Sequence, residues 1–425
     1  MWVSSLVMRR MMTLTMAAML VTLLTGSCGG GSSSSSSGGA DRTVLVDYKH
    51  DEFVSTFLRY YPANVKVRPG DNVTFRQAWT GEPHSVTMGK VVDEAIELLP
   101  VVGQYATPEE AQAGGVSEEV ITKASVTFSK LPPMTNRGFG IYQPGAKPCF
   151  VEDYDAIPAF TDAEGQTNPD TKCPTSGKPQ PRFNGRQGLY NSGFIPFQGR
   201  KENTFTLPIA ADATPGTYQY YCNYHYFEMS GSVEVVDKGK SIPSEDAVKR
   251  EAQREIAKDA KGALNKVRQA NEGKFGDAKL PLAGRTTGRD RDAVAIDEFF
   301  PSSIKAKVGK PVTWTLEGAP HTVSFNVPKY FPIFEVSKLG AVRWDPQSYE
   351  PVAWSVPPLP EGGGPESPPT PRLVDVGAWD GKGGFHSSGF LVPGDTFTVT
   401  FTKAGTYPYA CVLHPLMVGK VEVKA

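Results

Sequence analysis

Each half of this 425-residue chain contains one set of side chains that could form a metal site. In each set a histidine lies upstream, Cys-x2-His follows much later, and a methionine comes within a few residues. The two sets are His84, Cys222, His225 and Met229, and His321, Cys411, His414 and Met417. A soft thiolate and thioether combined with two imidazoles select copper, whereas zinc rarely takes methionine. The pattern therefore predicts two mononuclear copper sites, one in each half.

These ligands lie within a longer repeat. Three echoes occur in the same order in both halves, which indicates a tandem duplication: 65–86 with 304–323, 192–196 with 388–393, and 216–235 with 405–423. Glycine and proline, at 43 and 36 residues, favour a turn-rich β architecture. Short alternating runs predict strands at 65–67, 73–76, 204–207, 218–222, 312–316, 396–401 and 407–411. We therefore expect an all-β fold of two Greek-key β-sandwich domains with long insertions, joined by a helical linker.

The domain organisation follows from the repeat and from shifts in composition. We expect a signal peptide at 1–27, a Gly/Ser tether at 28–42, the first domain at 43–237, a helical linker at 238–291 and the second domain at 292–425. Acidic residues and an apolar stripe follow Ser244, which predicts one helix over 244–272. A capping box that begins at Thr107 predicts a short helix in the first insertion. The proline-rich segment 357–371 is expected to be irregular.

Both halves resemble the cupredoxins, the plastocyanin–amicyanin type of blue-copper domain. The shared motif is Gly-x-Tyr-x-Tyr-x-Cys-x2-His…Met, with Pro-His-(Ser/Thr)-Val upstream. The resemblance implies two type 1 copper ions, held by the eight side chains named above, and electron transfer to and from redox partner proteins. In the second half the spacing to Met417 matches amicyanin. In the first half Met229 lies one residue further on, so the neighbouring Glu228 is an alternative axial ligand.

The resemblance also implies how electrons would reach the metal. In this family the downstream histidine usually pierces an apolar patch, so we expect exposed edges at His225 and His414. The residues expected to surround these edges are Tyr224, Tyr226 and Phe227 in the first half, and Leu413, Pro415 and Leu416 in the second. The unequal axial spacing leads to the hypothesis that the two ions differ in reduction potential.

Two other functions compete with an electron carrier. A two-domain copper oxidase or nitrite reductase would need histidine next to the copper cysteine and His-x-His pairs. The chain has neither, and only His50 and His386, which we expect to be ordinary surface or core residues, remain after the two sites are filled. An extracytoplasmic copper-binding or delivery protein would use similar soft ligands, but its sites are usually rich in methionine. A net charge of −1 excludes the basic field needed for nucleic acid.

The N-terminus indicates export. Arg9 and Arg10 precede an apolar run that is too short to span a bilayer but suits a secretory signal. Cys28 and the Gly/Ser run after it resemble a bacterial lipoprotein signal, with Cys28 lipidated; ordinary cleavage or an uncleaved anchor are the alternatives. We therefore expect a lipid-anchored protein in the periplasm or on the outer face of the cytoplasmic membrane. Disulfides persist there, so we pair Cys149 with Cys173.

Overall fold

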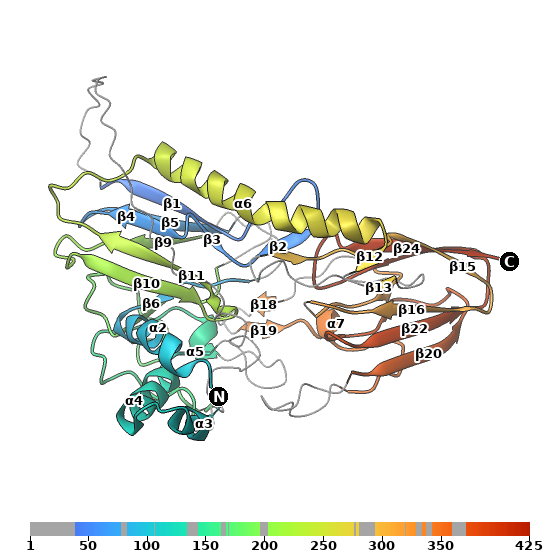
Figure 1. The fold of residues 1–425 in the computed structure, drawn as a ribbon, viewed down its shortest axis with the longest axis horizontal. Helices are drawn as coiled ribbons and strands as arrows, with labels where there is room; N and C mark the ends of the chain where they lie inside the picture. The colour runs from blue at the N-terminus through green and yellow to red at the C-terminus, as the bar shows by residue number, and fades with distance from the viewer. Residues whose placement is uncertain are drawn as a thin grey trace.

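The strands of both halves alternate buried and exposed side chains, as expected for sheets with one face on a core. The computed structural model describes residues 39–77, 83–105, 107–133, 143–162, 167–168, 170–195, 203–275, 278–279, 294–318, 320–328, 334–336, 342–358 and 371–425. The predicted signal peptide, the lipidated Cys28 and most of the proline-rich segment lie outside these residues. Figure 1 shows two sheet-rich lobes side by side, with one long helix lying across both.

The N-terminal lobe contains two sheets. One has the order β3 (Tyr60–Tyr61), β1 (Asp41–Val46), β5 (Asn72–Gln77) and β9 (Thr204–Pro208). The other has the order β4 (Asn64–Val67), β11 (Tyr226–Val235), β10 (Gly216–Cys222), β6 (Thr87–Met88), β8 (Leu189–Asn191) and β7 (Cys149–Val151). Val44, Phe75, Tyr220 and Val233 meet between the sheets in one buried core.

The C-terminal lobe repeats this plan. Its larger sheet has the order β15 (Ser303–Lys307), β24 (Val418–Lys424), β23 (Gly405–Ala410), β17 (Ser324–Phe325) and β21 (His386–Ser387). Its smaller sheet has β16 (Pro311–Thr315), β22 (Thr396–Phe401) and β20 (Leu373–Trp379). The order β15-β24-β23-β17-β21 matches β4-β11-β10-β6-β8 strand for strand. The all-β class, the seven predicted strands and the duplication are confirmed.

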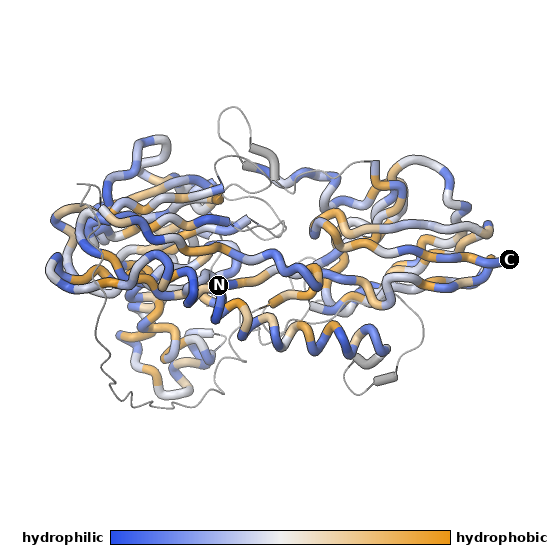
Figure 2. Tube along the Cα trace, turned by 90° about the horizontal axis from the view of Figure 1, so that it is seen from above, coloured by the Kyte–Doolittle hydropathy of each residue, from blue (hydrophilic) through white to orange (hydrophobic). Residues whose placement is uncertain are grey.

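The linker helix forms as predicted. Helix α6 (Glu245–Asn271) begins after Ser244, whose side chain accepts the backbone N–H of Ala247. Its buried stripe of small and apolar residues packs against β1, β3 and the strand β14 (Val294–Ile296). The hairpin of β12 (Lys274–Phe275) and β13 (Ala278–Lys279) follows. In Figure 2 this helix alternates hydrophobic and hydrophilic residues, and the hydrophobic residues of the lobes concentrate on their strands.

The first insertion is more helical than the sequence predicted. It contains α2 (Lys90–Val102), α3 (Pro108–Ala113), α4 (Glu118–Ser129) and the short α5 (Gln143–Ala146). Only α3, capped by Thr107, was expected. The second insertion contributes β18 (Phe334–Val336), β19 (Val342–Trp344) and α7 (Pro346–Tyr349). Within the described residues no helix is both long enough and apolar enough to cross a membrane.

A segment of the first lobe joins the second. We call residues 48–59 the arm. In the first repeat they lie between Asp47 and Tyr60. In the second repeat the corresponding residues, Asp297 and Phe299, are separated by Glu298 alone. The arm contains β2 (Ser55–Phe57), which pairs antiparallel with β14. Its Phe53 and Phe57 pack with α6 and β14 in a third buried core that both lobes share.

Candidate metal centres

The N-terminal centre gathers side chains from three places in the fold. Cys222 ends β10, His225 lies in the turn to β11, and His84 is held by a bridge to Ile195. The Cys222 sulfur lies 4.0 Å from Nδ1 of His84 and 3.7 Å from Nδ1 of His225. His84 and Cys222 are fully buried, and His225 is half-buried. One ion at their centre could contact all three ligand atoms, which lie within 4.8 Å of one another.

The C-terminal centre has the same construction. Cys411 follows β23, and a two-way backbone bridge to Leu391 holds His321. The Cys411 sulfur lies 4.0 Å from Nδ1 of His321 and 3.6 Å from Nδ1 of His414, and the two Nδ1 atoms are 2.9 Å apart. All three side chains are buried. Both predicted triads are therefore brought together.

The predicted axial methionines lie in the same cores as the cysteines. Met229 is fully buried with Cys222, and Met417 is fully buried with Cys411. The backbone N–H of Cys411 donates to the carbonyl of Met417, which closes the ligand loop. Glu228 is half-buried and alternates with Met229 along β11, so the two side chains leave the strand on opposite faces. Met229 therefore remains the predicted axial ligand of the first centre.

A hydroxyl residue after each upstream histidine braces the cysteine loop. In the first centre the backbone N–H of Asn223 donates to Oγ of Ser85, 2.9 Å away. In the second, the N–H of Val412 donates to Oγ1 of Thr322 at 2.9 Å, and the N–H of Thr322 donates to the Cys411 sulfur at 3.3 Å. A hydrogen bond to the sulfur stabilises negative charge there, which is one way a protein tunes a copper–thiolate site.

Buried charge surrounds the N-terminal centre. Nε2 of His84 lies 3.0 Å from Oδ2 of Asp47, and both side chains are fully buried. Burial lowers the pKa of His84, but its hydrogen bonds with Asp47 and Cys222 outweigh burial and raise the pKa to about 10. Burial raises the pKa of Cys222, but hydrogen bonds from His225 and His84 hold that pKa well below its usual range. The carboxylate and the thiolate together favour a cation at this position.

The second centre also has a buried carboxylate beside it. Oδ1 of Asp297 lies 4.0 Å from Nδ1 of His414. Burial raises the pKa of Cys411, but the charge and hydrogen bond of His414 and the N–H of Thr322 lower it overall. Neither Asp47 nor Asp297 was predicted as a site residue from the sequence. A signal was present, because each follows an apolar strand and precedes an aromatic-aromatic-proline sequence, Tyr-Tyr-Pro or Phe-Phe-Pro.

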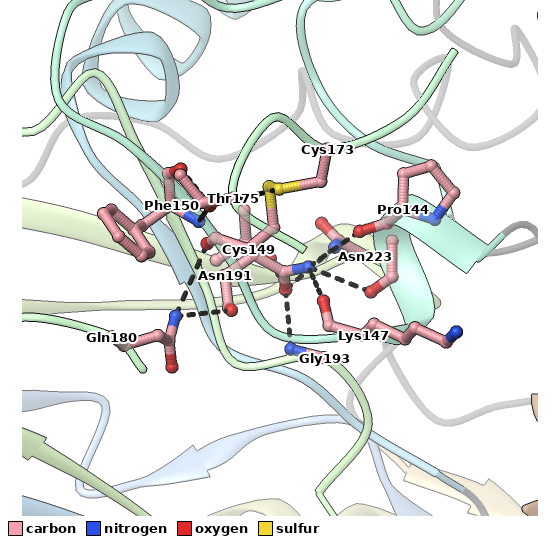
Figure 3. Close-up of a disulfide and its surroundings, with 12 residues drawn as sticks. Pro144, Lys147, Cys149, Phe150, Cys173, Thr175, Gln180, Asn191, Gly193 and Asn223 are labelled. Atoms are coloured by element: carbon pink, nitrogen blue, oxygen red, sulfur yellow. Dashed lines mark hydrogen bonds between the residues drawn. A yellow bond between two sulfur atoms is a disulfide. The ribbon is translucent and has the colours of Figure 1, made fainter. Parts of the chain in front are cut away.

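The predicted disulfide is confirmed, and it lies near the first centre. Cys149, on β7, is bonded to Cys173 (Figure 3). Next to it on β8, the side chain of Asn191 donates to the carbonyls of Gly145 and Lys147, both 3.0 Å away. Oδ1 of Asn191 accepts from the side chain of Asn223, which follows Cys222. The insertion is thus tied to the metal-binding loop.

One expectation about access is wrong. His225 is half-buried and Tyr226 is exposed, but His414 is only 3% exposed. The arm lies over this histidine's loop: a cavity of about 300 Å³ is lined by arm residues 49–55 together with Glu298, Pro415 and Leu416. The sequence could not show this cover, because it comes from the other lobe. Leu413 and Phe227, expected on the surface, are buried.

The two remaining histidines do not join either centre. His50 is part of the arm and stacks against Phe53 and Phe57. His386 packs against Trp354 and Trp379. In the described part of the chain, only the two triads bring three His, Cys or carboxylate groups within reach of one ion.

The fold and the donor set define a class of protein. A Greek-key sandwich that places cysteine at a strand end, histidine in the next turn, methionine shortly after it and a second histidine from elsewhere in the sheet fits a copper ion of the cupredoxin type. Residues 375–424 match the family of copper binding proteins of the plastocyanin/azurin type. This match lies within the C-terminal lobe, whose sandwich and ligand set are cupredoxin-like. The N-terminal domain shares its strand order and its ligand set.

Solved structures of two cupredoxins are similar to part of this chain. A reduced Cu(I) form of an amicyanin mutant at pH 4 is 19% identical over 35% of this chain and 85% of its own, with a TM-score of 0.19. A purple cupredoxin from Nitrosopumilus maritimus is 21% identical over 30% of this chain and 82% of its own, with a TM-score of 0.16. Likeness at this level carries no weight for function. No curated protein matches the chain significantly.

Proposed function

We propose that each domain binds one type 1 copper ion and that the chain carries electrons between redox partner proteins. Copper, when bound, supplies a couple that gains or loses one electron. His84, Cys222 and His225 would hold it in the first domain, and His321, Cys411 and His414 in the second, with Met229 and Met417 as axial ligands. The buried cores fix these side chains, so little rearrangement accompanies the change of charge.

The observation that supports this proposal most is the convergence of one sulfur and two Nδ1 atoms in each lobe, 3.6–4.0 Å from sulfur to nitrogen. Burial of the sulfurs keeps water from the metal, which suits electron transfer better than hydrolysis or ligand exchange. Release of copper to another protein, the delivery function, would be opposed by the same burial. An oxidase or reductase would need a further copper, and among the residues that the structure describes neither His50 nor His386 lies with other possible ligands.

Copper titration of the intact chain and of two cysteine variants tests the proposal. The unmodified chain should bind two copper ions, show an intense sulfur-to-copper charge-transfer absorption, and undergo reversible one-electron reduction at each site. Cys222→Ser and Cys411→Ser should each lose one ion and one part of the absorption. A colourless Cu(I) protein that gives its metal readily to a chelator would instead support delivery. Retention of both ions in either variant would contradict the assigned ligands.

Export and membrane attachment belong to the same proposal. The apolar segment before Cys28 and the Gly/Ser run after it support a lipid anchor, which would hold the two domains near membrane-bound redox partners. The disulfide between Cys149 and Cys173 supports an oxidising compartment. Metabolic labelling with a radioactive fatty acid should label the chain, and Cys28→Ala should abolish the label.

A further inference from the structure

A continuous series of buried groups links the two metal centres, and the arm supplies its middle. It starts at the first centre, where Nε2 of the ligand His84 lies 3.0 Å from Oδ2 of Asp47. The other oxygen of Asp47 accepts the backbone N–H of Phe57, on β2 of the arm, at 2.7 Å. His84, Asp47 and Phe57 are all fully buried.

The series continues from β2 to the second centre. Thr56 shares a peptide bond with Phe57, and its hydroxyl donates to Oδ2 of Asp297 at 2.9 Å. The other oxygen of Asp297 lies 4.0 Å from Nδ1 of the ligand His414. The exposed fractions of Thr56 and Asp297 are 0% and 1%, so water reaches neither. One residue pair of the arm thus touches two carboxylates, each of which lies beside a predicted copper ligand.

We propose that this link, from His84 through Asp47, Phe57, Thr56 and Asp297 to His414, conducts electrons between the two centres; the proposal rests on the proposed function. One electron leaves the ligand set of the reduced site and arrives at that of the oxidised site, so one is oxidised as the other is reduced. No bond forms or breaks, and no proton is transferred. External redox proteins supply and remove the electron.

The link suits tunnelling because electronic coupling decays far more slowly along covalent and hydrogen bonds than across empty space. The series contains three hydrogen bonds and covalent segments, and its one weaker step is the 4.0 Å approach to His414. The second ligand, His414, is only 3% exposed, and the arm lines a cavity with the two residues that follow it, Pro415 and Leu416. Direct contact between His414 and a partner protein is therefore hindered, while His225 is partly open, so the second centre exchanges electrons chiefly through the first.

The test measures electron transfer within the copper-loaded full chain. Pulse radiolysis delivers less than one electron per chain, and the charge-transfer absorption of the two sites is followed afterwards, with Cys222→Ser and Cys411→Ser providing each site's spectrum. A first-order phase whose rate does not depend on protein concentration should appear. Thr56→Val removes the hydroxyl but keeps the branched shape, and should slow this phase several-fold. Thr56→Ser restores the hydroxyl and should restore the rate.

Thr313→Val is the matched control, because the Thr313 hydroxyl bonds to that of Thr398 in the C-terminal lobe and lies outside the link. It should leave the rate unchanged. The copper content and both reduction potentials of Thr56→Val should equal those of the unmodified chain, which separates a conducting role from a purely structural one. If the two absorptions overlap, the same comparison is made in Met229→Gln chains, whose sites differ in axial ligand.

Each outcome bears on one proposal or both. An unchanged rate in Thr56→Val, or no concentration-independent phase in the unmodified chain, overturns the relay while leaving the copper carrier intact. A fall in rate accompanied by loss of copper or by shifted potentials assigns Thr56 a structural role and also overturns the relay. Absence of charge-transfer absorption in the unmodified chain overturns the proposed function itself.

Discussion

The two axial positions differ in spacing although the rest of the ligand set is duplicated. Three residues separate His225 from Met229, and two separate His414 from Met417. Met229 is buried in the same core as Cys222, and Glu228 leaves the strand on the other face, so we expect the extra residue to be accommodated with sulfur still as the axial ligand. The axial ligand tunes the reduction potential of such a site.

Met229→Gln should therefore lower the reduction potential of the N-terminal site alone. An amide oxygen is harder than a thioether and favours the more highly charged Cu(II) state. Redox titration followed by absorption gives the potential of each site. Glu228→Gln is the control and should leave both potentials unchanged. A shift in Glu228→Gln without one in Met229→Gln would make Glu228 the axial ligand.

The histidine and cysteine ligands could be predicted from the sequence because both halves of the chain contain them at matching positions. His84 and His321 could be assigned because the same Pro-His sequence occurs at the same place in each half, and the Cys-x2-His pairs are adjacent along the chain. Asp47 and Asp297 lie within the same duplicated frame, but the arm separates Asp47 from its Tyr-Tyr-Pro sequence and so obscures the correspondence. Their roles depend on contacts with the arm, and Thr56 and Asp297 are 241 residues apart.

At the scale of elements, helix α2 braces the strand that ends in Cys222. Oδ1 of Asp93, in the first turn of α2, accepts the backbone N–H of Gln219 on β10 at 2.7 Å. Burial of this carboxyl raises its pKa from 3.8 to about 6, although the hydrogen bond from Gln219 opposes the shift. The folded chain therefore binds this proton more tightly than the unfolded chain does.

This shift predicts a pH-dependent contribution to stability. The contribution of Asp93 to the free energy of unfolding should be largest below about pH 4 and should fall as pH rises from about 4 to about 6, because the ionised carboxyl is disfavoured in the fold. Asp93→Asn does not titrate, so the stability of the variant relative to the unmodified chain should increase over this range by about 1–3 kcal/mol. Urea unfolding of both copper-free chains at several pH values measures the difference. A difference that stays constant from pH 4 to pH 7 would contradict the prediction.

Helices α2 and α4 of the first insertion were not predicted, although their sequences carry local helix signals. Helix α4 follows Ser117, whose side chain accepts the N–H of Val120, and two acidic residues come next, which are ordinary start signals. Helix α2 follows Gly89 without a side-chain cap and contains Pro100, so its start is marked more weakly, by Asp93 in the first turn and by its apolar periodicity. The seven strands that were predicted, in contrast, are marked directly by short alternating runs between turn residues, whereas strands such as β1 and β14 were not predicted.

At the scale of the whole molecule, the arm makes the two centres unequal in access. His414 is buried near the arm, which lines a cavity with the two residues after this histidine, whereas His225 is partly open. A water-soluble Cu(I) chelator should therefore remove copper from the N-terminal site first. Phe53→Ala, which removes an aromatic ring of the arm from the third core, should speed removal from the C-terminal site.

Absorption spectra recorded during chelation measure both rates, and Cys222→Ser isolates the C-terminal phase. Phe128→Ala, a truncation of the same size in α4, serves as the control and should leave the C-terminal rate as it is. Equal rates at the two sites of the unmodified chain would show that the arm does not restrict access.

The core formed by helix α6, the arm and β14 also bears on how this protein can evolve. Phe57 and Ile296 come from different halves, and each is covered only when both halves are present with the helix between them. Losing either copy would uncover an apolar surface, and a surface of that kind promotes aggregation. Selection should therefore keep the two halves together in one chain, while their exposed loops can diverge.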